Sequence, residues 1–363
     1  HTILLIDGVR YGSATAGTPV WDNIPVDMIE RIEVLKGPAS ALYGPDAAGG
    51  VVQIFTRRGT QGLAPYAAAT VGTNSYRELS AGLRGGQDNV RYALGVSHTD
   101  DKGFSATNPS VPFGNHNPDR DGFSQKALNA SVDWQLNSDW KLSAGALYSD
   151  GTNHFDDGLG ADTKSDARST VLRAGVEGRI TPEWTTRLNY SQGTDRSNAL
   201  VSASPWNIPG LFETQQDQWS WQNDIKTPVG TVVAGAETLL QKVNSSTAYT
   251  VTERRINAVF AGLNGTSGGH SWQLNARRDD NSQFGGSSTG YAGYGYQFNK
   301  NWRAHASYGT SFVAPSFNQL YWPGFGNTLL VPEEGKNTEF GVDWTEGNHH
   351  VKLIRFDNKI RGF

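Results

Sequence analysis

The sequence predicts a transmembrane antiparallel β-barrel preceded by a small mixed α/β domain. Two patterns support this prediction: segments of about ten residues with alternating polarity, and connections between them that are alternately short and long. Composition agrees, since only 37% of the 363 residues are hydrophobic, yet 11% are aromatic, with 11 Trp and 13 Tyr. A barrel wall with lipid outside, a polar lumen inside and aromatic girdles at the interfaces combines these features.

The alternation is clearest in three segments. One face of each segment carries the apolar and aromatic residues, and the other face carries Arg, His, Ser, Lys and Gly. The apolar sets are Val90/Tyr92/Leu94/Val96, Trp140/Leu142/Ala144/Ala146/Tyr148 and Trp302/Ala304/Ala306/Tyr308. A dry sandwich core would not accept the Arg and His of the opposite faces without partners, whereas a watery lumen would.

The connections also follow the barrel pattern. Short ones contain Gly, Pro, Asn or Asp, the residues of tight hairpin turns, and long polar stretches lie near 100–123, 150–166, 197–212 and 313–336. Trp residues follow four of the short turns closely: Trp140, Trp184, Trp272 and Trp302. Because outer-membrane barrels have short periplasmic turns and long extracellular loops, these four Trp predict a periplasmic aromatic belt. Cross-strand packing in a soluble β-protein is the alternative.

We expect residues 61–363 to form the barrel, with about 15 strands from Pro65 to Phe363. Single-chain bacterial barrels have an even number of strands, and an open edge in lipid leaves backbone groups unpaired. We therefore expect further strands after this segment. The segment opens at His1 without a signal peptide, so we also expect a start further upstream.

Composition excludes other classes. The chain has no Cys, so it has neither disulfides nor thiolate metal sites. Its net charge of −4 and the lack of basic runs argue against nucleic-acid binding. No stretch approaches the roughly 20 apolar residues of a membrane helix.

Residues 1–60 break the alternating pattern. The sequence predicts strands at Ile3–Ile6, Ile32–Leu35 and Val51–Thr56, a helical turn within 22–29 and a second short helix at Ala39–Tyr43. A mixed α/β domain of this size is too small to bury a good core alone.

Ordered motifs in this region carry a family resemblance. They are Ile6-Asp7-Gly8-Val9, Ile24-Pro25, Glu30–Pro38, Ala41-Leu42-Tyr43-Gly44 and Gly49–Ile54. In this order they resemble the C-terminal half of the plug of TonB-dependent outer-membrane receptors. In the barrel, Arg278–Gly285, Ala306–Pro315, Asn318-Gln319-Leu320-Tyr321 and Pro332-Glu333 resemble the cobalamin transporter branch of that family.

The resemblance implies a lumenal plug and energised uptake across the outer membrane of a Gram-negative bacterium. The expected partners are outer-membrane lipid, the TonB complex, acting through a box upstream of His1, and cobalamin as ligand. A ferric siderophore or haem is the alternative ligand. We expect a monomer and no required cofactor. Topology places ligand-facing candidates at the plug apices and in a long loop: Tyr11, Ser13, Thr18, Pro45, Asp46, Tyr321 and Trp322.

Two further site predictions follow from the resemblance. Arg31 matches a plug arginine that meets wall glutamates, and Glu339 matches one of those glutamates; an unpaired buried Arg would be costly. Asp119, Asp121 and Asp156 match long-loop aspartates that bind calcium in cobalamin transporters. Ser105 stands where a further acidic residue is expected, and Leu128 excludes an EF-hand because its twelfth position needs a carboxylate. A solvated acidic loop is the alternative.

Other functions remain open at this point. A passive gated porin, a surface receptor that signals without transport, and an outer-membrane enzyme all share barrel architecture. No catalytic constellation is evident among the eight scattered His residues, and a lumen filled by a plug gives no reason to prefer an enzyme.

Overall fold

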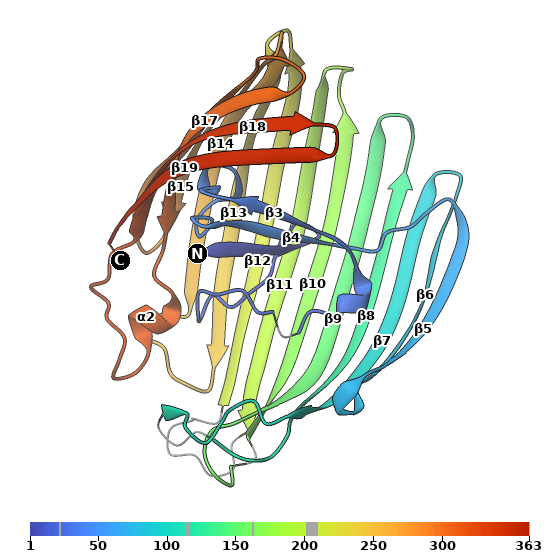
Figure 1. Ribbon diagram of the computed structural model, residues 1–363, viewed down its shortest axis with the longest axis vertical. Helices are drawn as coiled ribbons and strands as arrows, with labels where there is room; N and C mark the ends of the chain where they lie inside the picture. The colour runs from blue at the N-terminus through green and yellow to red at the C-terminus, as the bar shows by residue number, and fades with distance from the viewer. Residues whose placement is uncertain (22, 113–115, 162, 201–209, 363) are drawn as a thin grey trace.

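The structure is a computed structural model, and it describes residues 1–363 except Asp22, 113–115, 162, 201–209 and 363. Parts of the predicted segments 22–29, 100–123, 150–166 and 197–212 therefore lie outside the described residues. A curved wall of antiparallel strands surrounds a small sheet that lies within its concave side (Figure 1). Among the described residues, no helix is long and apolar enough to cross a membrane.

The wall is a 15-stranded sheet in which each strand pairs with its neighbours in sequence, which confirms the predicted fold class and strand number. Its strands are β5 (Gly62–Val71), β6 (Arg77–Gln87), β7 (Val90–Phe104), β8 (Asp121–Gln135), β9 (Trp140–Phe155), β10 (Thr163–Arg179), β11 (Trp184–Leu200), β12 (Gly210–Thr227), β13 (Gly230–Ser245), β14 (Glu253–Ser267), β15 (His270–Asn281), β16 (Gly285–Gln297), β17 (Trp302–Val313), β18 (Glu333–Glu346) and β19 (His349–Arg361). Two short helices accompany them: η2 (Thr73–Ser75) and α2 (Phe317–Tyr321).

The inner sheet has four strands in the order β2-β1-β4-β3. Its elements are β1 (Thr2–Ile6), β2 (Val9–Arg10), η1 (Val26–Met28), β3 (Ile29–Lys36), α1 (Ser40–Tyr43) and β4 (Gly50–Thr56). β4 is parallel to β1 and antiparallel to β3. We call residues 1–60 the plug and the 15-stranded sheet the wall.

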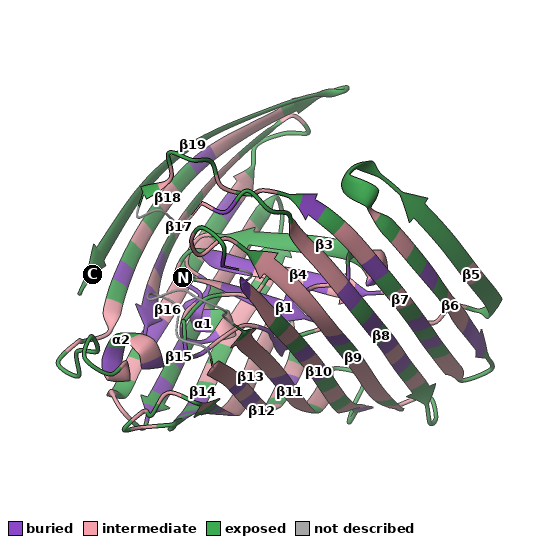
Figure 2. Cartoon of the chain, turned by 90° about the horizontal axis from the view of Figure 1, so that it is seen from below, coloured by how far each residue is buried: buried purple, intermediate pink, exposed green. Residues whose placement is uncertain are grey.

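Alternation along the strands sorts the side chains as predicted. Neighbouring residues of β9 illustrate it: Tyr148 is 36% exposed on the outer face, whereas Leu147 and Ser149 are 5% and 1% exposed on the inner face. Buried positions recur along the inner side of the wall where it meets the plug (Figure 2).

The plug has a small apolar cluster of its own, formed by Ile3, Leu5, Ala39, Ala47 and Val51, and shares a larger one with the wall. Leu4, Ile6, Val9 and Ile54 pack in one cluster with Ala127, Leu147 and Val171, which belong to β8, β9 and β10. The wall thus completes the apolar core that this short segment cannot bury by itself.

Several strands continue beyond the limits that polarity suggested. The sequence placed polar loops at 150–166 and 197–212, but β9 runs to Phe155, β10 starts at Thr163 and β11 runs to Leu200. This part of the prediction is wrong because polar residues are compatible with a strand wherever the hairpin extends past the membrane into water.

The wall is not closed in this segment. Within the described chain, β5 and β19 each pair on one side only, and an opening separates them (Figure 2). β3 lies beside this opening, with Ile32 and Val34 54% and 60% exposed.

Candidate functional site at the plug apex

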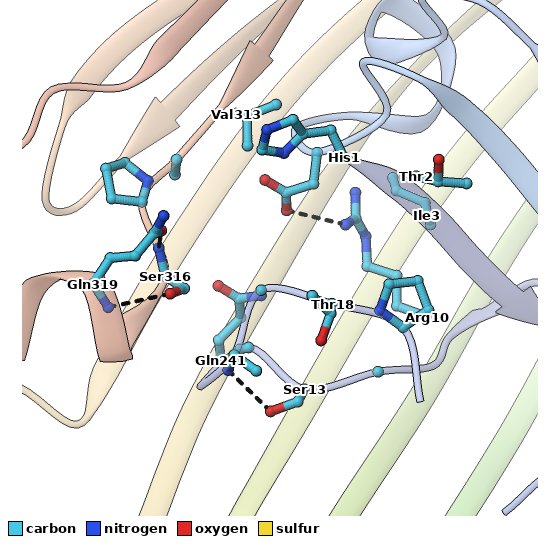
Figure 3. Close-up of a pocket in the computed structure, with 18 of the residues that line it drawn as sticks. His1, Thr2, Ile3, Arg10, Ser13, Thr18, Gln241, Val313, Ser316 and Gln319 are labelled. Carbon is cyan, nitrogen blue, oxygen red and sulfur yellow. Dashed lines mark hydrogen bonds and ion pairs between the residues drawn. The ribbon is translucent and has the colours of Figure 1, made fainter. Parts of the chain in front are cut away.

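A cavity of about 310 Å³ lies between the plug, the wall and the long connection that carries α2 (Figure 3). The plug contributes the loop 11–19 and Asp46, the wall contributes Gln216, Gln241 and Arg254, and the connection contributes Ser316 and Gln319. The connection lies at the long-loop end of the wall, which is the extracellular end of such barrels.

α2 holds one side of this cavity because its first turn is well capped. The Ser316 side chain accepts from the Gln319 N–H, and the Gln319 side chain accepts from the Ser316 N–H. This capping box satisfies two backbone donors that a helix start otherwise leaves free.

α2 also docks directly on the plug apex. The Asn318 N–H donates to the Thr15 carbonyl at 2.9 Å, and Phe317, fully buried, packs with Ala14 and Val243. On its other side, Tyr249 from the β13–β14 connection donates a hydrogen bond to Asn318. The connection thus bridges plug and wall over the cavity.

Uncharged side chains join the plug loop to the wall. Asn23, 1% exposed, bonds Gln125 (3.0 Å), Ser149 (2.8 Å) and Ser169 (3.0 Å) on β8, β9 and β10. Further along the wall, the Thr15 and Thr214 hydroxyls lie 2.9 Å apart. Such neutral contacts satisfy buried polar groups without burying charge.

Ion pairs form a second plug–wall junction. Asp7 accepts from the plug's Arg58 at 3.2 Å and lies 3.8 Å from Arg173 on β10. Nearby, Glu30 pairs with Arg84 of β6 at 3.3 Å. Asp7 is held further by the Thr56 N–H and hydroxyl, so its carboxylate is fully engaged.

Gly44 marks a close approach of the plug to β15. Its φ is +82°, and a Cβ there would lie 3.0 Å from an Nη of Arg277 and 3.1 Å from an Nη of Arg10. Only glycine accommodates both the conformation and the two guanidinium groups. Arg277 is compensated by Glu237 at 2.7 Å and Asp279 at 2.9 Å.

The predicted Arg31–Glu339 pair does not form. Arg31 bonds Glu33 at 2.7 Å and stacks on Phe55, while Glu339 lies 3.3 Å from His305. Residues two apart on a strand share a face, so Glu33 is the carboxylate nearest to Arg31. Ion pairs from other plug residues, among them Asp7 and Glu30, join the plug to the wall instead.

The predicted ligand-facing residues separate into two groups. Ser13, Thr18 and Asp46 line the cavity, as does Tyr11, whose side chain is only 4% exposed. The others do not line it. Pro45 is buried and its carbonyl accepts from Arg10, Tyr321 accepts from Gln283, and Trp322 stacks on Phe212.

The three aspartates of the calcium prediction lie together. One carboxylate oxygen from each of Asp119, Asp121 and Asp156 lies within 4.8 Å of the other two. An Asp156 oxygen, Oδ1, is buried without a hydrogen-bond partner among the described residues. Ser105 does not supply a further carboxylate; its hydroxyl donates to the Asn117 carbonyl.

Known protein families match both parts of the chain. The TonB-dependent Receptor Plug Domain model matches residues 1–51, and the TonB dependent receptor-like β-barrel model matches residues 193–363. Together with the fold, these matches show that the chain belongs to the TonB-dependent receptor family, a family of transporters and receptors with transmembrane barrels.

A vitamin B12 transporter, BtuB of Photobacterium profundum, is 32% identical over 352 residues, which is 95% of this chain and 56% of that protein. Among solved structures, the siderophore receptors PirA of Acinetobacter baumannii and of Pseudomonas aeruginosa superpose with TM-scores of 0.80 and 0.79. They are 18% and 20% identical, and the match covers 99% of this chain and 62% and 66% of theirs. The chain thus spans little more than half of the curated relative.

Sequence reasoning missed Asn23, Asp7 and Arg254. Asn23 and Asp7 have roles because the plug meets specific wall strands, and Arg254 because it meets the connection that carries α2; no local pattern specifies these contacts. A weak signal existed for Arg254, since an arginine on the inner face of an alternating strand requires partners in the lumen.

Proposed function

We propose that this chain forms the plug and wall of an outer-membrane transporter that imports cobalamin in a Gram-negative bacterium. Ligand would bind at the cavity between plug apex and α2, and TonB would then drive a rearrangement of the plug. The observation that carries the choice of cobalamin is the 32% identity with a vitamin B12 transporter over 95% of the chain. The siderophore receptors, at 18–20% identity, share the fold.

The geometry supports a ligand that contacts the plug and the wall at the same time. The cavity is lined by plug, wall and loop residues at the end of the wall with long connections. Because α2 contacts both the plug apex and the β13–β14 connection, a ligand there would affect the plug through bonds already formed.

A binding titration tests the choice of ligand. The full-length transporter in detergent is titrated with cobalamin and with ferric siderophores of the catecholate and hydroxamate types. We expect saturable, tight binding of cobalamin. Binding of a ferric siderophore without binding of cobalamin would assign the transporter to the alternative ligand class.

We further propose that Asp119, Asp121 and Asp156 bind calcium. Oxygen ligands are those that this hard cation prefers, and three carboxylates at this spacing repel one another unless a cation neutralises them. The unpartnered Asp156 oxygen fits the same role. When bound, calcium would neutralise these charges and order the two connections from which the aspartates come.

A further inference from the structure

Arg254 is the buried cation of the cavity that has no carboxylate partner. It is 4% exposed at the start of β14. Its Nε donates to Gln283 Oε1 and its Nη2 to the Pro315 carbonyl, both at 2.7 Å. Its guanidinium lies 4.8 Å from the Phe317 ring centre. No ion pair among the described residues includes it, so carbonyl oxygens and ring faces are its compensation.

Each carboxylate that lines the cavity lies closest to a group other than Arg254. Asp46 lies 3.7 Å from Arg10, and Glu333 lies 3.0 Å from His1. The remaining polar wall groups, Gln216 and Gln241, are neutral, and Gln241 donates to Gln216 at 3.0 Å. The cavity therefore contains one buried cation, Arg254, that has no carboxylate within ion-pair distance among the described residues and on which Asp46 acts only from further away.

An uncompensated buried guanidinium is costly, and a bound anion relieves this cost. Arg is also the side chain best suited to bind the paired oxygens of phosphate or carboxylate. The Nη1 group has no hydrogen-bond partner among the described residues, while Nε and Nη2 hold the guanidinium in place.

From this geometry we infer that Arg254 binds an anionic group of the transported ligand. The inference rests on the proposed transport function and specifies the ligand chemistry of its site. In cobalamin the group is the phosphodiester; in a ferric siderophore it is an anionic iron-chelating oxygen. Arg254 thereby favours ligands that carry such an anionic group over relatives that lack it.

The test compares ligands that differ in this anion. Full-length transporter and its Arg254→Gln variant are titrated with cobalamin and with cobinamide, a corrinoid without the nucleotide and its phosphodiester. The same proteins are titrated with an anionic ferric tris-catecholate and a neutral ferric tris-hydroxamate. The matched control is Arg255→Gln, because Arg255 is the adjacent arginine and is exposed on the other face of β14.

We expect Arg254→Gln to weaken binding of cobalamin or of the tris-catecholate at least about 10-fold. Binding of cobinamide or of the tris-hydroxamate should weaken less than about 2-fold. Arg254→Lys retains the charge, so its affinity for the ligand with the anionic group should lie between those of the parent and the Gln variant. Added salt should weaken binding of the ligand that carries the anionic group in the parent, and much less in the Gln variant. Arg255→Gln should change neither.

Equal weakening of both ligands of the bound pair would show that Arg254 acts only by holding Pro315 and α2, and this result would overturn the inference. Unchanged affinity for both ligands would overturn it as well. The same titrations test the proposed function independently of Arg254. If the parent binds the siderophores and no corrinoid, the choice of cobalamin fails, and the siderophore pair decides the role of Arg254.

Discussion

Asp119 lies just before β8, Asp121 is its first residue and Asp156 follows the end of β9, yet their carboxylate oxygens lie within 4.8 Å of one another. The family resemblance selected these three residues, and the alternation of long connections with tight turns predicted that they lie on one side of the barrel. The spacing of the oxygens could not be predicted, because it depends on the path of the connections.

Calcium should tighten ligand binding by ordering these connections before the ligand docks. Asp119→Asn combined with Asp121→Asn should abolish the effect while the barrel stays folded. Ligand titrations of the parent and the double variant, in calcium and in chelator, measure this effect. Asp88→Asn, in a turn at the opposite end of the wall, is the control. The same affinity in calcium and in chelator for the parent would leave these aspartates as solvated charges.

Substitution of Asp7 tests which ion pairs hold the plug in the wall. It is a buried carboxylate in contact with Arg58, Arg173 and Thr56, and breaking such a group costs about 3–5 kcal/mol. Asp7→Ala should loosen the plug and raise leakage of small solutes through the full-length protein. Arg31→Ala should have little effect, because its pair with Glu33 is exposed and such pairs contribute about 0–1 kcal/mol.

Leakage through reconstituted vesicles compares the two variants. Greater leakage for Arg31→Ala than for Asp7→Ala would favour the Arg31–Glu339 junction that the family resemblance suggested. The prediction from the sequence failed here because matching residue types identified two charged residues, but their partners depend on how the plug is oriented in the lumen.

At the scale of elements, α2 is the part of the structure whose stability should control the cavity. Ser316→Ala removes the capping box, and loss of an N-cap side chain costs about 1 kcal/mol. Hydrogen exchange of residues 316–322 should accelerate, and ligand affinity should fall modestly. Exchange unchanged by this substitution would mean that the tertiary contacts of α2, and not its cap, hold the helix.

Tyr249 gives α2 a pH dependence. Burial raises the pKa of Tyr249 to about 12, so the neutral phenol that donates to Asn318 is favoured in the folded state. The stabilisation is complete below pH 10, the ordinary pKa of tyrosine, and is lost as pH rises through 12. Exchange in α2 should therefore accelerate between pH 10 and 12, and Tyr249→Phe should remove that step.

The strands illustrate what alternation can and cannot predict. The outward and inward faces of β9 followed from polarity, because lipid and lumen impose opposite requirements on adjacent residues. The strand ends could not be predicted from polarity. Past the membrane both faces of a strand are polar, and the hairpin continues until its backbone pairing stops. The contact of α2 with Thr15 was equally hidden, since it joins residues 303 positions apart.

At the scale of the whole molecule, the open wall determines how residues 1–363 should behave in isolation. Among the residues that the structure describes, β5 and β19 each lack a partner on one side, and unpaired backbone in lipid or detergent costs several kcal/mol per group. We expect this segment alone to form no heat-resistant barrel. Gel migration that changes on heating, as for a closed barrel, would contradict this expectation.

Energised uptake of cobalamin is the central claim, and transport in cells tests it most directly. The full-length gene is expressed in a Gram-negative strain that lacks its own cobalamin receptor, and labelled cobalamin uptake is measured with and without functional TonB. We predict uptake that requires both the gene and TonB. Uptake that persists without TonB would identify a passive pore, and no uptake despite surface expression would contradict the assignment to cobalamin.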